Sequence, residues 1–380
     1  MLQPGRVRPR PRKGHSQAYS GVQPVSSLTH STQAFQPLPT PLGEPPYHYD
    51  LESILPGIGA QAAAHGNLVF HCVGDTGGIK NGDYQTNVAN AMKADLNLPA
   101  AKVPSFFYHL GDVVYFNGQP SKYYSQFYEP YDGYTPPIIS IPGNHDGDPI
   151  NKTQVSLDGW VEYFMTAQPH VDPISHDSPR VTMSQPNVYF TLLCPFVTIV
   201  GMYTNVPDGG SVDSVQQQWL SNEFATADPS KALIVALHHP VYSFDDYHSG
   251  SPNMANVLDQ AINDSQRLPN LVLMGHVHDY QRIEQTVAGI TVPFIVSGNG
   301  GYYNLHKLNT APGTTDPDNG AKLIAGDDQN HGYMALTVNA KNISGAVTSV
   351  DDSTGVATPF DAFSYPAGMR SLPAGTTVKL

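Results

Sequence analysis

Five short blocks of this sequence place metal-ligating side chains directly after runs of apolar residues. In chain order they occupy positions 74–77 (GDTG), 111–115 (GDVVY), 143–146 (GNHD), 235–239 (VALHH) and 275–278 (GHVH). Their candidate metal ligands are Asp75, Asp112, Tyr115, Asn144, His238, His276 and His278. This set is large enough to hold two adjacent metal ions, and paired metal ions are well suited to phosphoester chemistry.

In four of the five blocks a glycine stands immediately before the first donor: Gly74, Gly111, Gly143 and Gly275. Glycine allows a strand to end in a sharp turn and allows the backbone to approach a ligand closely. In open α/β sheets, ligands bind beyond the carboxyl ends of the strands. We therefore expect the donors that follow these glycines to converge at one edge of a sheet.

The donor types narrow the choice of metal. Carboxylate and phenol oxygens are hard ligands, whereas imidazole suits zinc, iron and copper. Asp112 has two carboxylate oxygens and could bridge both metals. Tyr115 follows it by three residues, and a phenol has an ordinary pKa near 10. Its ionisation near neutral pH needs a strong Lewis acid, which favours Fe(III) over a divalent ion.

The apolar runs before the blocks are four to six residues long, which is the length of a strand buried on both faces. They occupy residues 68–73, 106–110, 138–141, 233–237 and 271–274. Amphipathic helical patterns occupy residues 86–98, 212–224 and 254–262. The alternation predicts a layered α/β fold with a two-sheet β-sandwich core flanked by helices. Residues 293–296, 333–338 and 343–350 are expected to be closing strands of the second sheet.

The chain is expected to divide into three parts. Residues 1–46 are rich in Pro, Ser, Thr and Gln and predict a disordered or surface-draped basic arm, residues 47–350 the catalytic domain, and residues 351–380 a tail wrapping the surface. Residues 146–187 predict an irregular excursion near the mouth of the site. The two cysteines, Cys72 and Cys194, lie in apolar runs and are expected to be buried free thiols.

Composition bears on the partners of the chain. The net charge of −13 gives no general attraction for nucleic acid, so a nucleic-acid partner is not expected. It is compatible with a small phosphate ester as substrate if bound metals neutralise the site. No apolar run approaches the roughly 18 residues of a membrane-spanning helix. The first residues carry several arginines without a hydrophobic centre, so they do not form a complete signal peptide as written.

The order of the five blocks resembles that of the calcineurin-like metallophosphoesterases, over residues 66–338. Tyr115 in the second block and Gly77 in the first resemble the purple acid phosphatase branch. The resemblance implies an acid phosphatase that hydrolyses phosphomonoesters with a metal-bound hydroxide. It also implies an exported or periplasmic location, as does the weakly charged composition, although no signal peptide is visible.

The resemblance also implies two ligand sets. The set expected to hold Fe(III) is Asp75, Asp112, Tyr115 and His278. The set expected to hold a second divalent metal (Fe, Zn or Mn) is Asp112, Asn144, His238 and His276. Asp112 belongs to both sets.

Three further histidines are candidates for catalysis. His145, next to Asn144, is placed to hydrogen-bond the phosphate or to protonate the leaving oxygen. His248 lies ten residues after His238, where plant members of the family carry a histidine that contacts the substrate. His239 has two open interpretations, a substrate contact or a structural role.

Other polar residues in the blocks also leave alternatives open. Asp146 could orient the imidazole of His145 or cap a turn. His71 and His109 lie inside predicted strands and are expected to be hydrogen-bonded core residues. The roles of His306 and His331 stay undecided.

Two other functions compete with a monoesterase. A phosphodiesterase or nucleotide hydrolase of the same superfamily would have an Asp-x-His first block, whereas this chain has Gly77 at the third position. A non-catalytic metal-binding protein would bind metal without turnover.

Overall fold

The five apolar runs ahead of the metal-ligand blocks form strands whose every residue is buried. A computed structural model describes residues 35–380 of the chain. The strands are β2 (Leu68–Val73), β3 (Phe107–His109), β4 (Ile138–Ser140), β7 (Ala232–Leu237) and β9 (Leu271–Met274). Strands covered on both faces have no polar face, which is why these segments read as continuous apolar runs.

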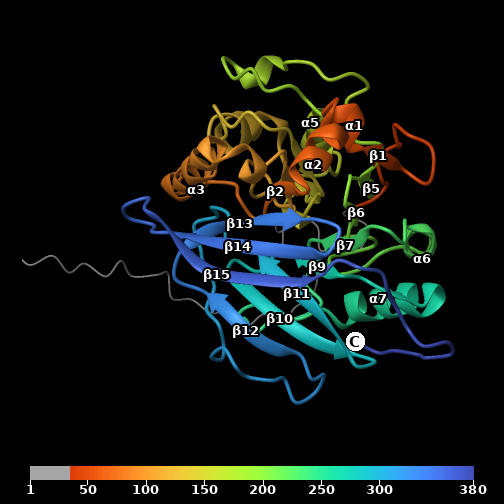
Figure 1. Ribbon diagram of the computed structural model, residues 1–380. Coiled ribbons are helices and arrows are strands. Elements are labelled where there is room, and N and C mark those ends of the chain that lie inside the picture. The colour runs from red at the N-terminus through yellow and green to blue at the C-terminus, as the bar shows by residue number, and fades with distance from the viewer. Residues whose placement is uncertain (1–34) are drawn as a thin grey trace, which may run out of the picture.

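Within residues 35–380 the strands form two large sheets that pack on each other, with helices outside them (Figure 1). The eight-stranded sheet has the order β1-β5-β6-β7-β9-β11-β10-β12, the six-stranded sheet has the order β15-β14-β13-β2-β3-β4, and β16 pairs with β8. The remaining strands are β1 (His48–Asp50), β5 (Phe190–Leu193), β6 (Val197–Gly201), β8 (Arg267–Leu268), β10 (Tyr280–Val287), β11 (Ile290–Ser297), β12 (Lys322–Asp327), β13 (His331–Val338), β14 (Asn342–Val350), β15 (Ala357–Pro366) and β16 (Arg370–Ser371). The predicted layered α/β fold with a two-sheet core is confirmed.

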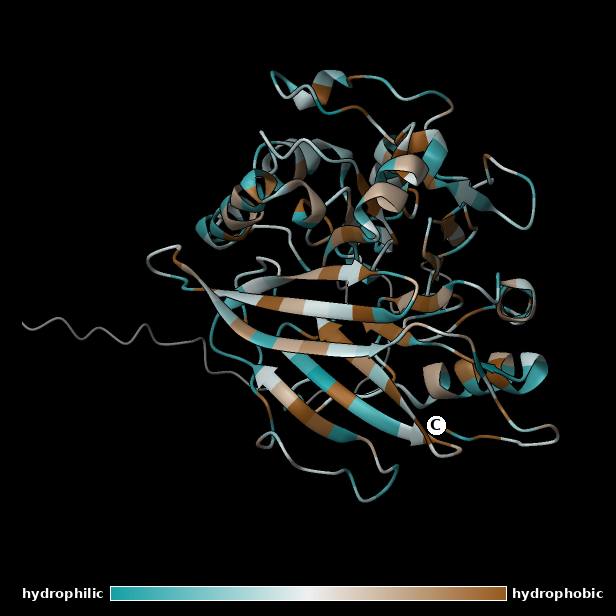
Figure 2. Cartoon of the chain, viewed as in Figure 1, coloured by the Kyte–Doolittle hydropathy of each residue, from teal (hydrophilic) through white to brown (hydrophobic). Residues whose placement is uncertain are grey.

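The three predicted helices are present as α3, α6 and α7. The α-helices are α1 (Leu51–Ile54), α2 (Ile58–His65), α3 (Asp83–Ala94), α4 (Asn144–Gly147), α5 (Asp158–Phe164), α6 (Ser214–Thr226) and α7 (Pro252–Ser265). Shorter helical turns are η1 (Asp95–Asn97), η2 (Ala100–Lys102), η3 (Pro120–Lys122), η4 (Tyr124–Tyr128, of π type) and η5 (Pro173–Ser175). Helix α7 begins where Ser251 accepts a hydrogen bond from the Met254 amide and Pro252 takes the first position. Figure 2 shows hydrophobic colour on the strands of the core and hydrophilic colour on parts of α7.

The metal-ligand blocks follow strands of both sheets. Strands β2, β3 and β4 are parallel neighbours in the six-stranded sheet, whereas β7 and β9 are parallel neighbours in the eight-stranded sheet. The expectation that the donors converge at the edge of one sheet is therefore wrong in that respect. The carboxyl ends of parallel strands from both sheets come together, and each sheet contributes part of the site.

The predicted closing strands divide between the sheets instead of forming the second one together. Strand β11 pairs with β9 in the eight-stranded sheet, while β13 pairs antiparallel with β2 in the six-stranded sheet. A local pattern identifies a buried strand but not its partner, because the backbone groups that pair are the same in every strand.

Two further segments differ from their predictions. The expected C-terminal tail contains β15, which pairs with β14 along residues 342–350. The expected irregular stretch at 146–187 contains helix α5, whose Trp160 and Phe164 are buried in the core. Most of the predicted N-terminal arm lies outside the described residues.

The smaller structural expectations are met. Cys72 and Cys194 are buried free thiols, and burial raises the pKa of each. His71 is hydrogen-bonded to Tyr134 and Asp95 inside the core. No helix within residues 35–380 is both long enough and apolar enough to cross a membrane.

Candidate metal centre

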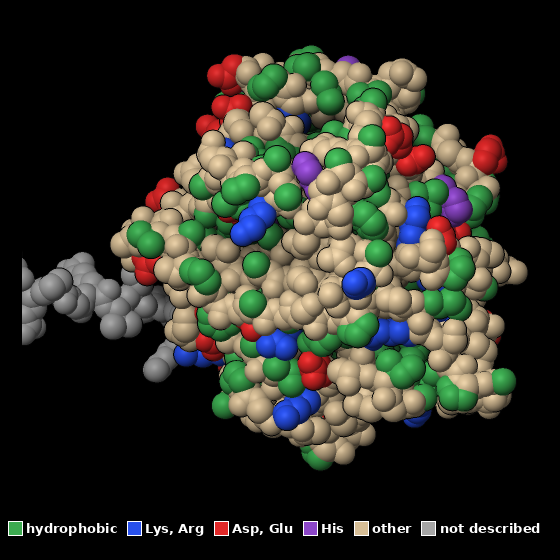
Figure 3. Space-filling model, in the orientation of Figure 1, with side chains coloured by type: hydrophobic (Ala, Val, Ile, Leu, Met, Phe, Trp, Pro, Cys, Tyr) green, Lys and Arg blue, Asp and Glu red, His purple; other side chains and the backbone are tan. Residues whose placement is uncertain are grey.

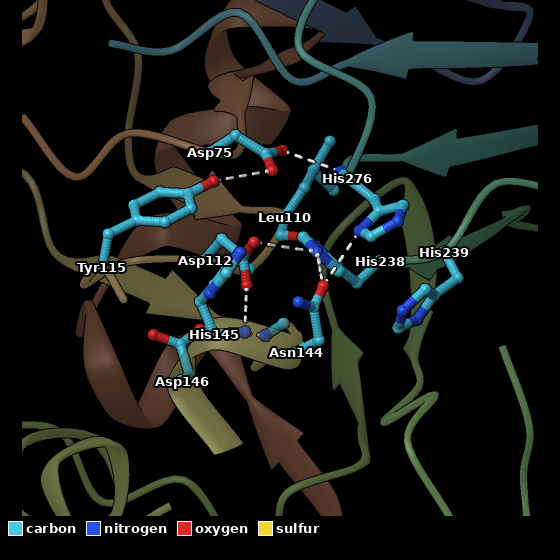
Figure 4. Close-up of polar contacts among 12 residues, drawn as sticks. Asp75, Leu110, Asp112, Tyr115, Asn144, His145, Asp146, His238, His239 and His276 are labelled. Atoms are coloured by element: carbon cyan, nitrogen blue, oxygen red, sulfur yellow. Dashed lines mark hydrogen bonds and ion pairs between the residues drawn. The ribbon is translucent and has the colours of Figure 1, made fainter. Parts of the chain in front are cut away.

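Three of the predicted metal ligands adopt a backbone conformation that is unusual for residues with side chains. The φ angles of Asp75, Asp112 and His276 are 56°, 55° and 69°. The left-handed region costs an L-residue roughly 1–2 kcal/mol, and such residues cluster at functional sites. Each directly follows a glycine that comes after a strand, and Figure 4 shows the three side chains gathered where the loops after these strands meet.

The glycines act mainly by allowing close approach. At Gly143 an added Cβ would overlap the carboxylate of Asp112, so a larger residue would displace that side chain. Gly111, with φ of 93°, also needs the left-handed conformation. The blocks can therefore pack against each other at backbone distance.

One group of donors gathers around the amide of Asn144. Its Oδ1 lies 2.9 Å from Nδ1 of His276 and 3.2 Å from Nε2 of His238. The same Nε2 lies 3.3 Å from Oδ2 of Asp112. Ligand atoms of Asp112, His238 and His276 all lie within 4.8 Å of one another, which is close enough for one cation to contact them together.

A second group gathers around the phenol of Tyr115. Its hydroxyl lies 3.1 Å from Oδ1 of Asp75 and 3.3 Å from Nε2 of His278. The other carboxylate oxygen of Asp75 accepts a 2.8 Å hydrogen bond from the amide of His276. Asp75 therefore links the two groups and, with them, the two sheets.

Backbone hydrogen bonds orient two of the donors. Nδ1 of His238 lies 2.8 Å from the carbonyl oxygen of Leu110, which leaves Nε2 facing the other donors. The amide of Tyr115 donates to Oε1 of Gln126, and Nε2 of Gln126 donates to the carbonyl of Tyr115, both at 2.9 Å. Gln126 could not be identified from the sequence, because it belongs to no block and only the folded chain brings η4 next to Tyr115.

Asp146 organises the loops of the second and third blocks. Its carboxylate accepts hydrogen bonds from the amides of Val113 at 3.0 Å, Val114 at 3.2 Å and Gly143 at 2.9 Å. The imidazole of His145 instead has Nδ1 2.8 Å from the carbonyl oxygen of Phe116. Of the two open interpretations of Asp146, capping a turn is the one that the structure shows.

Each of the three candidate catalytic histidines lies beside one of the donors. His145 is partly exposed, and its ring centroid lies 4.6 Å from that of Tyr115. His239 is buried, with Nδ1 2.7 Å from the hydroxyl of Thr204 and its ring 4.5 Å from that of His276. The ring of His248 lies 4.6 Å from that of His276.

The structure also places the two undecided histidines. The ring of His306 lies 4.4 Å from that of His278, and its Nδ1 lies 3.0 Å from Oδ2 of Asp245. His331 lies behind the site, where its Nε2 is 2.8 Å from the carbonyl oxygen of Tyr302. His306 therefore lines the site, while His331 supports a loop beside it.

The electrostatics of the site suit cation binding. Burial favours the neutral form of Asp112, but the positive charges of His238 and His145 prevail and hold the pKa of Asp112 below its usual range. Burial, together with the carboxylates of Asp112 and Asp75, raises the pKa of Tyr115 well above its ordinary value. Ionisation of Tyr115 therefore requires a compensating cation of high charge.

Burial lowers the pKa of His276 well below its ordinary value, so the imidazole is neutral as a metal ligand must be. His109 is also neutral, because burial lowers its pKa to about 3. It is hydrogen-bonded to Thr76 and to the amide of Gly111, as expected for a core residue. Both histidines thus favour the uncharged ring.

Comparisons with known proteins agree with this geometry. A solved structure described as GAP50, the anchor in the inner membrane complex of Plasmodium, superposes with a TM-score of 0.54 at 14% identity, covering 80% of this chain and 90% of that one. A structure of PhoD superposes with a TM-score of 0.51 at 13% identity, covering 89% of this chain and 74% of that one. At these identities the likeness concerns the fold alone. No curated protein matches the chain at a significant level.

A family comparison covers the part of the chain that carries the candidate donors. Residues 48–280 match the family described as calcineurin-like phosphoesterase, and this range includes every donor named above. The family match, the two-sheet fold and the cluster of Asp112, His238 and His276 lead to one conclusion. The chain belongs to the calcineurin-like phosphoesterase family.

Proposed function

We propose that this protein is a metal-dependent acid phosphatase that hydrolyses phosphomonoesters at a two-metal centre. The observation that carries the proposal is the meeting of two donor groups from two sheets, which Asp75 links through its hydrogen bonds with Tyr115 and the amide of His276. We assign Asp112 to both groups. Oδ2 of Asp112 lies 3.3 Å from His238, while its negative charge acts on Tyr115. A carboxylate in this position suits a ligand that bridges two cations.

The two donor groups differ in chemistry, which supports two different metals. The group with Asp75, Tyr115 and His278 is rich in hard oxygen donors and includes a phenol, so we assign it Fe(III). The group with Asn144, His238 and His276 has two imidazoles and suits Fe(II), Zn(II) or Mn(II). When bound, the metals supply an activated water as nucleophile and neutralise charge on the phosphate.

The surrounding histidines are proposed to act on the substrate. His145 is partly exposed and is held through Nδ1 by the carbonyl of Phe116, so its other nitrogen can give a proton to the leaving oxygen. Burial lowers the pKa of His145, whereas a bound phosphate dianion would favour its protonated form. His239 and His248, whose rings lie beside that of His276, are proposed to contact phosphate oxygens.

The expected substrate is a small ester, and nucleic acid is not the expected partner. On the face shown in Figure 3, Lys and Arg side chains lie scattered among neutral and acidic ones. A long polyanion needs many cations along its path, and the scattered Lys and Arg side chains of this face do not form such a path. The net charge of −13 also opposes its binding.

Two other functions stay open. A phosphodiesterase would use the same metal centre, and Gly77 in the first block argues against it. A non-catalytic role is the second alternative. GAP50, which is similar to this chain in fold alone, is described as an anchor. The full set of donors around Asp112 favours catalysis over that role.

The first experiment compares the rates of hydrolysis of phenyl phosphate and diphenyl phosphate at acid pH. It also measures the metal content of the protein. We expect about one iron and one further transition metal per chain, and faster turnover of the monoester. Finding two manganese or two zinc ions would be consistent with a phosphoesterase, but it would contradict the assignment of Fe(III) and the role of Tyr115 as its ligand. Faster diester turnover would favour the phosphodiesterase, and bound metal without turnover would favour the non-catalytic role.

The role of His145 is tested with His145→Ala. This variant should lose on the order of 100- to 10,000-fold in kcat while keeping its metal content. His170→Ala, which changes an exposed histidine in the 165–182 segment, is the control and should keep both. Loss of metal in His145→Ala would mean that the residue maintains the site instead of acting on the substrate.

A further inference from the structure

An exposed aromatic residue borders the candidate proton donor. The side chain of Phe116 is 41% exposed, although it directly follows the buried Tyr115. Its ring centroid lies 5.7 Å from that of His145, at an interplanar angle of 65°. The carbonyl oxygen of the same residue lies 2.8 Å from Nδ1 of His145. The backbone of Phe116 thus positions the imidazole, while its ring lies at the opening beside it.

A second aromatic ring, which is buried, lies next to that of Phe116. The ring of Tyr302 lies 6.1 Å from that of Phe116 and stacks on Tyr115, with a centroid distance of 4.1 Å and an angle of 27°. Its amide donates a 3.0 Å hydrogen bond to the carbonyl of Asp75, and its own carbonyl lies 2.8 Å from Nε2 of His331. Tyr302 is therefore fixed by the metal-ligand loop itself.

The surface continues outward from Tyr302. The ring of Tyr303 lies 4.8 Å from that of Tyr302, and the Lys80 ammonium group donates a 2.7 Å hydrogen bond to the hydroxyl of Tyr303. We call Phe116, Tyr302 and Tyr303 the aromatic rim. It starts beside His145 with the exposed ring of Phe116 and continues over the donors, since the ring of Tyr302 also lies 4.4 Å from that of His278. Phe116 is thus the member of the rim that borders the side of His145 on which a leaving group would lie.

We infer that the aromatic rim selects phosphomonoesters whose leaving group is an aromatic ring attached directly to the ester oxygen. The inference rests on the proposed function, because it takes His145 as the proton donor to that oxygen. A group bonded to the oxygen must then lie within one ring width of His145, where the ring of Phe116 is the exposed neighbour. Aromatic rings pair edge-to-face or offset-stacked at centroid separations of 4.5–7 Å, whereas a polyol offers Phe116 neither ring contact nor apolar area.

The test compares phenyl phosphate with glycerol 2-phosphate in the wild type and in Phe116→Ala. Each variant is compared with the wild type on the same ester, so the different reactivities of the two esters cancel. We expect Phe116→Ala to lower kcat/KM for phenyl phosphate about three- to tenfold, mainly through KM, and to change glycerol 2-phosphate by less than about twofold. Phe116→Trp should restore the preference. Inhibition by inorganic phosphate, which has no leaving group, should be unchanged.

Phe360→Ala is the matched control, since Phe360 on β15 is 42% exposed and belongs to no part of the site. It should leave both esters unaffected. If Phe116→Ala loses equal activity on the two esters, or loses none on either, the role of the aromatic rim in substrate selection is wrong. The proposed phosphatase function would not be affected by that result. Absence of turnover with both esters in the wild type would remove the phosphatase and the rim together.

Discussion

The phenol of Tyr115 donates a 3.1 Å hydrogen bond to Oδ1 of Asp75, a residue 40 positions earlier in the chain. Asp75 lies in the loop after β2 and Tyr115 in the loop after β3, so the parallel pairing of these two strands brings the residues together. Both side chains are buried, and a second carboxylate, that of Asp112, lies near enough to raise the pKa of the phenol further. A cation of high charge would relieve this concentration of negative charge.

Replacement of Tyr115 by Phe should therefore change the metal spectrum more than the fold. With Fe(III) bound, the wild type should show a visible phenolate-to-iron charge-transfer band, and Tyr115→Phe should lose it. Tyr302→Phe is the control, because this ring stacks on Tyr115 without being a proposed ligand. Absorption spectra of iron-loaded proteins check the prediction, and a band that survives in Tyr115→Phe would remove this residue from the metal sphere.

Removal of the Asp146 carboxylate should loosen two metal-ligand loops at once. Asp146→Ala leaves the buried amides of Val113, Val114 and Gly143 without their acceptor, which should cost at least about 2 kcal/mol in the free energy of unfolding. Metal affinity should fall about 10- to 100-fold. Chemical denaturation and metal titration measure the two effects.

Asp351→Ala is the control for Asp146, since Asp351 also accepts hydrogen bonds from turn amides but is exposed. It should change stability by less than about 1 kcal/mol, because water replaces its hydrogen bonds. Equal effects of the two substitutions would show that Asp146 is only an ordinary turn residue.

The stability of the metal-free protein should fall on acidification, in part through His109. Burial lowers its folded-state pKa to about 3, against an ordinary value near 6.5. Between pH 6.5 and 3 the unfolded chain therefore binds more protons than the folded chain. The contribution of neutral His109 to the free energy of unfolding is fully present above pH 6.5, and it falls by about 1.4 kcal/mol per pH unit as the pH decreases towards 3. His109→Gln should show a correspondingly shallower decrease between pH 6.5 and 5, measured by urea unfolding. Parallel slopes in the two proteins would contradict the prediction.

The two sheets should be coupled through an ion pair between β10 and β15. Nε of Arg282 lies 2.7 Å from Oδ2 of Asp361, and its NH2 group lies 3.0 Å from Oδ1. Since both side chains are mostly buried, Arg282→Met should cost about 1.5–3 kcal/mol in the free energy of unfolding. A double-mutant cycle with Asp361→Leu should give a coupling energy of at least about 1 kcal/mol. A zero coupling energy would mean that this ion pair does not stabilise the packing of the two sheets.

The candidate donors and the strands that carry them can be recognised in the amino-acid sequence. Side-chain type decides which groups can bind a metal, and Asp75, Asp112 and Tyr115 are recognisable from their blocks before any fold is known. A strand buried on both faces, such as β7, must be apolar throughout, so its position is visible as a run of residues. Core histidines inside such runs, such as His109, could be assigned for the same reason.

The identity of neighbouring strands, and of the residues outside the blocks that reach the site, became visible in the folded chain. The pairing of β13 with β2 and the separation of the five blocks between two sheets depend on contacts between segments far apart in the chain. Gln126, His306 and Phe116 carry no local signal of a role, because each acquires one through a neighbour supplied by another segment. Side-chain chemistry is a property of each residue, whereas proximity is a property of the folded chain.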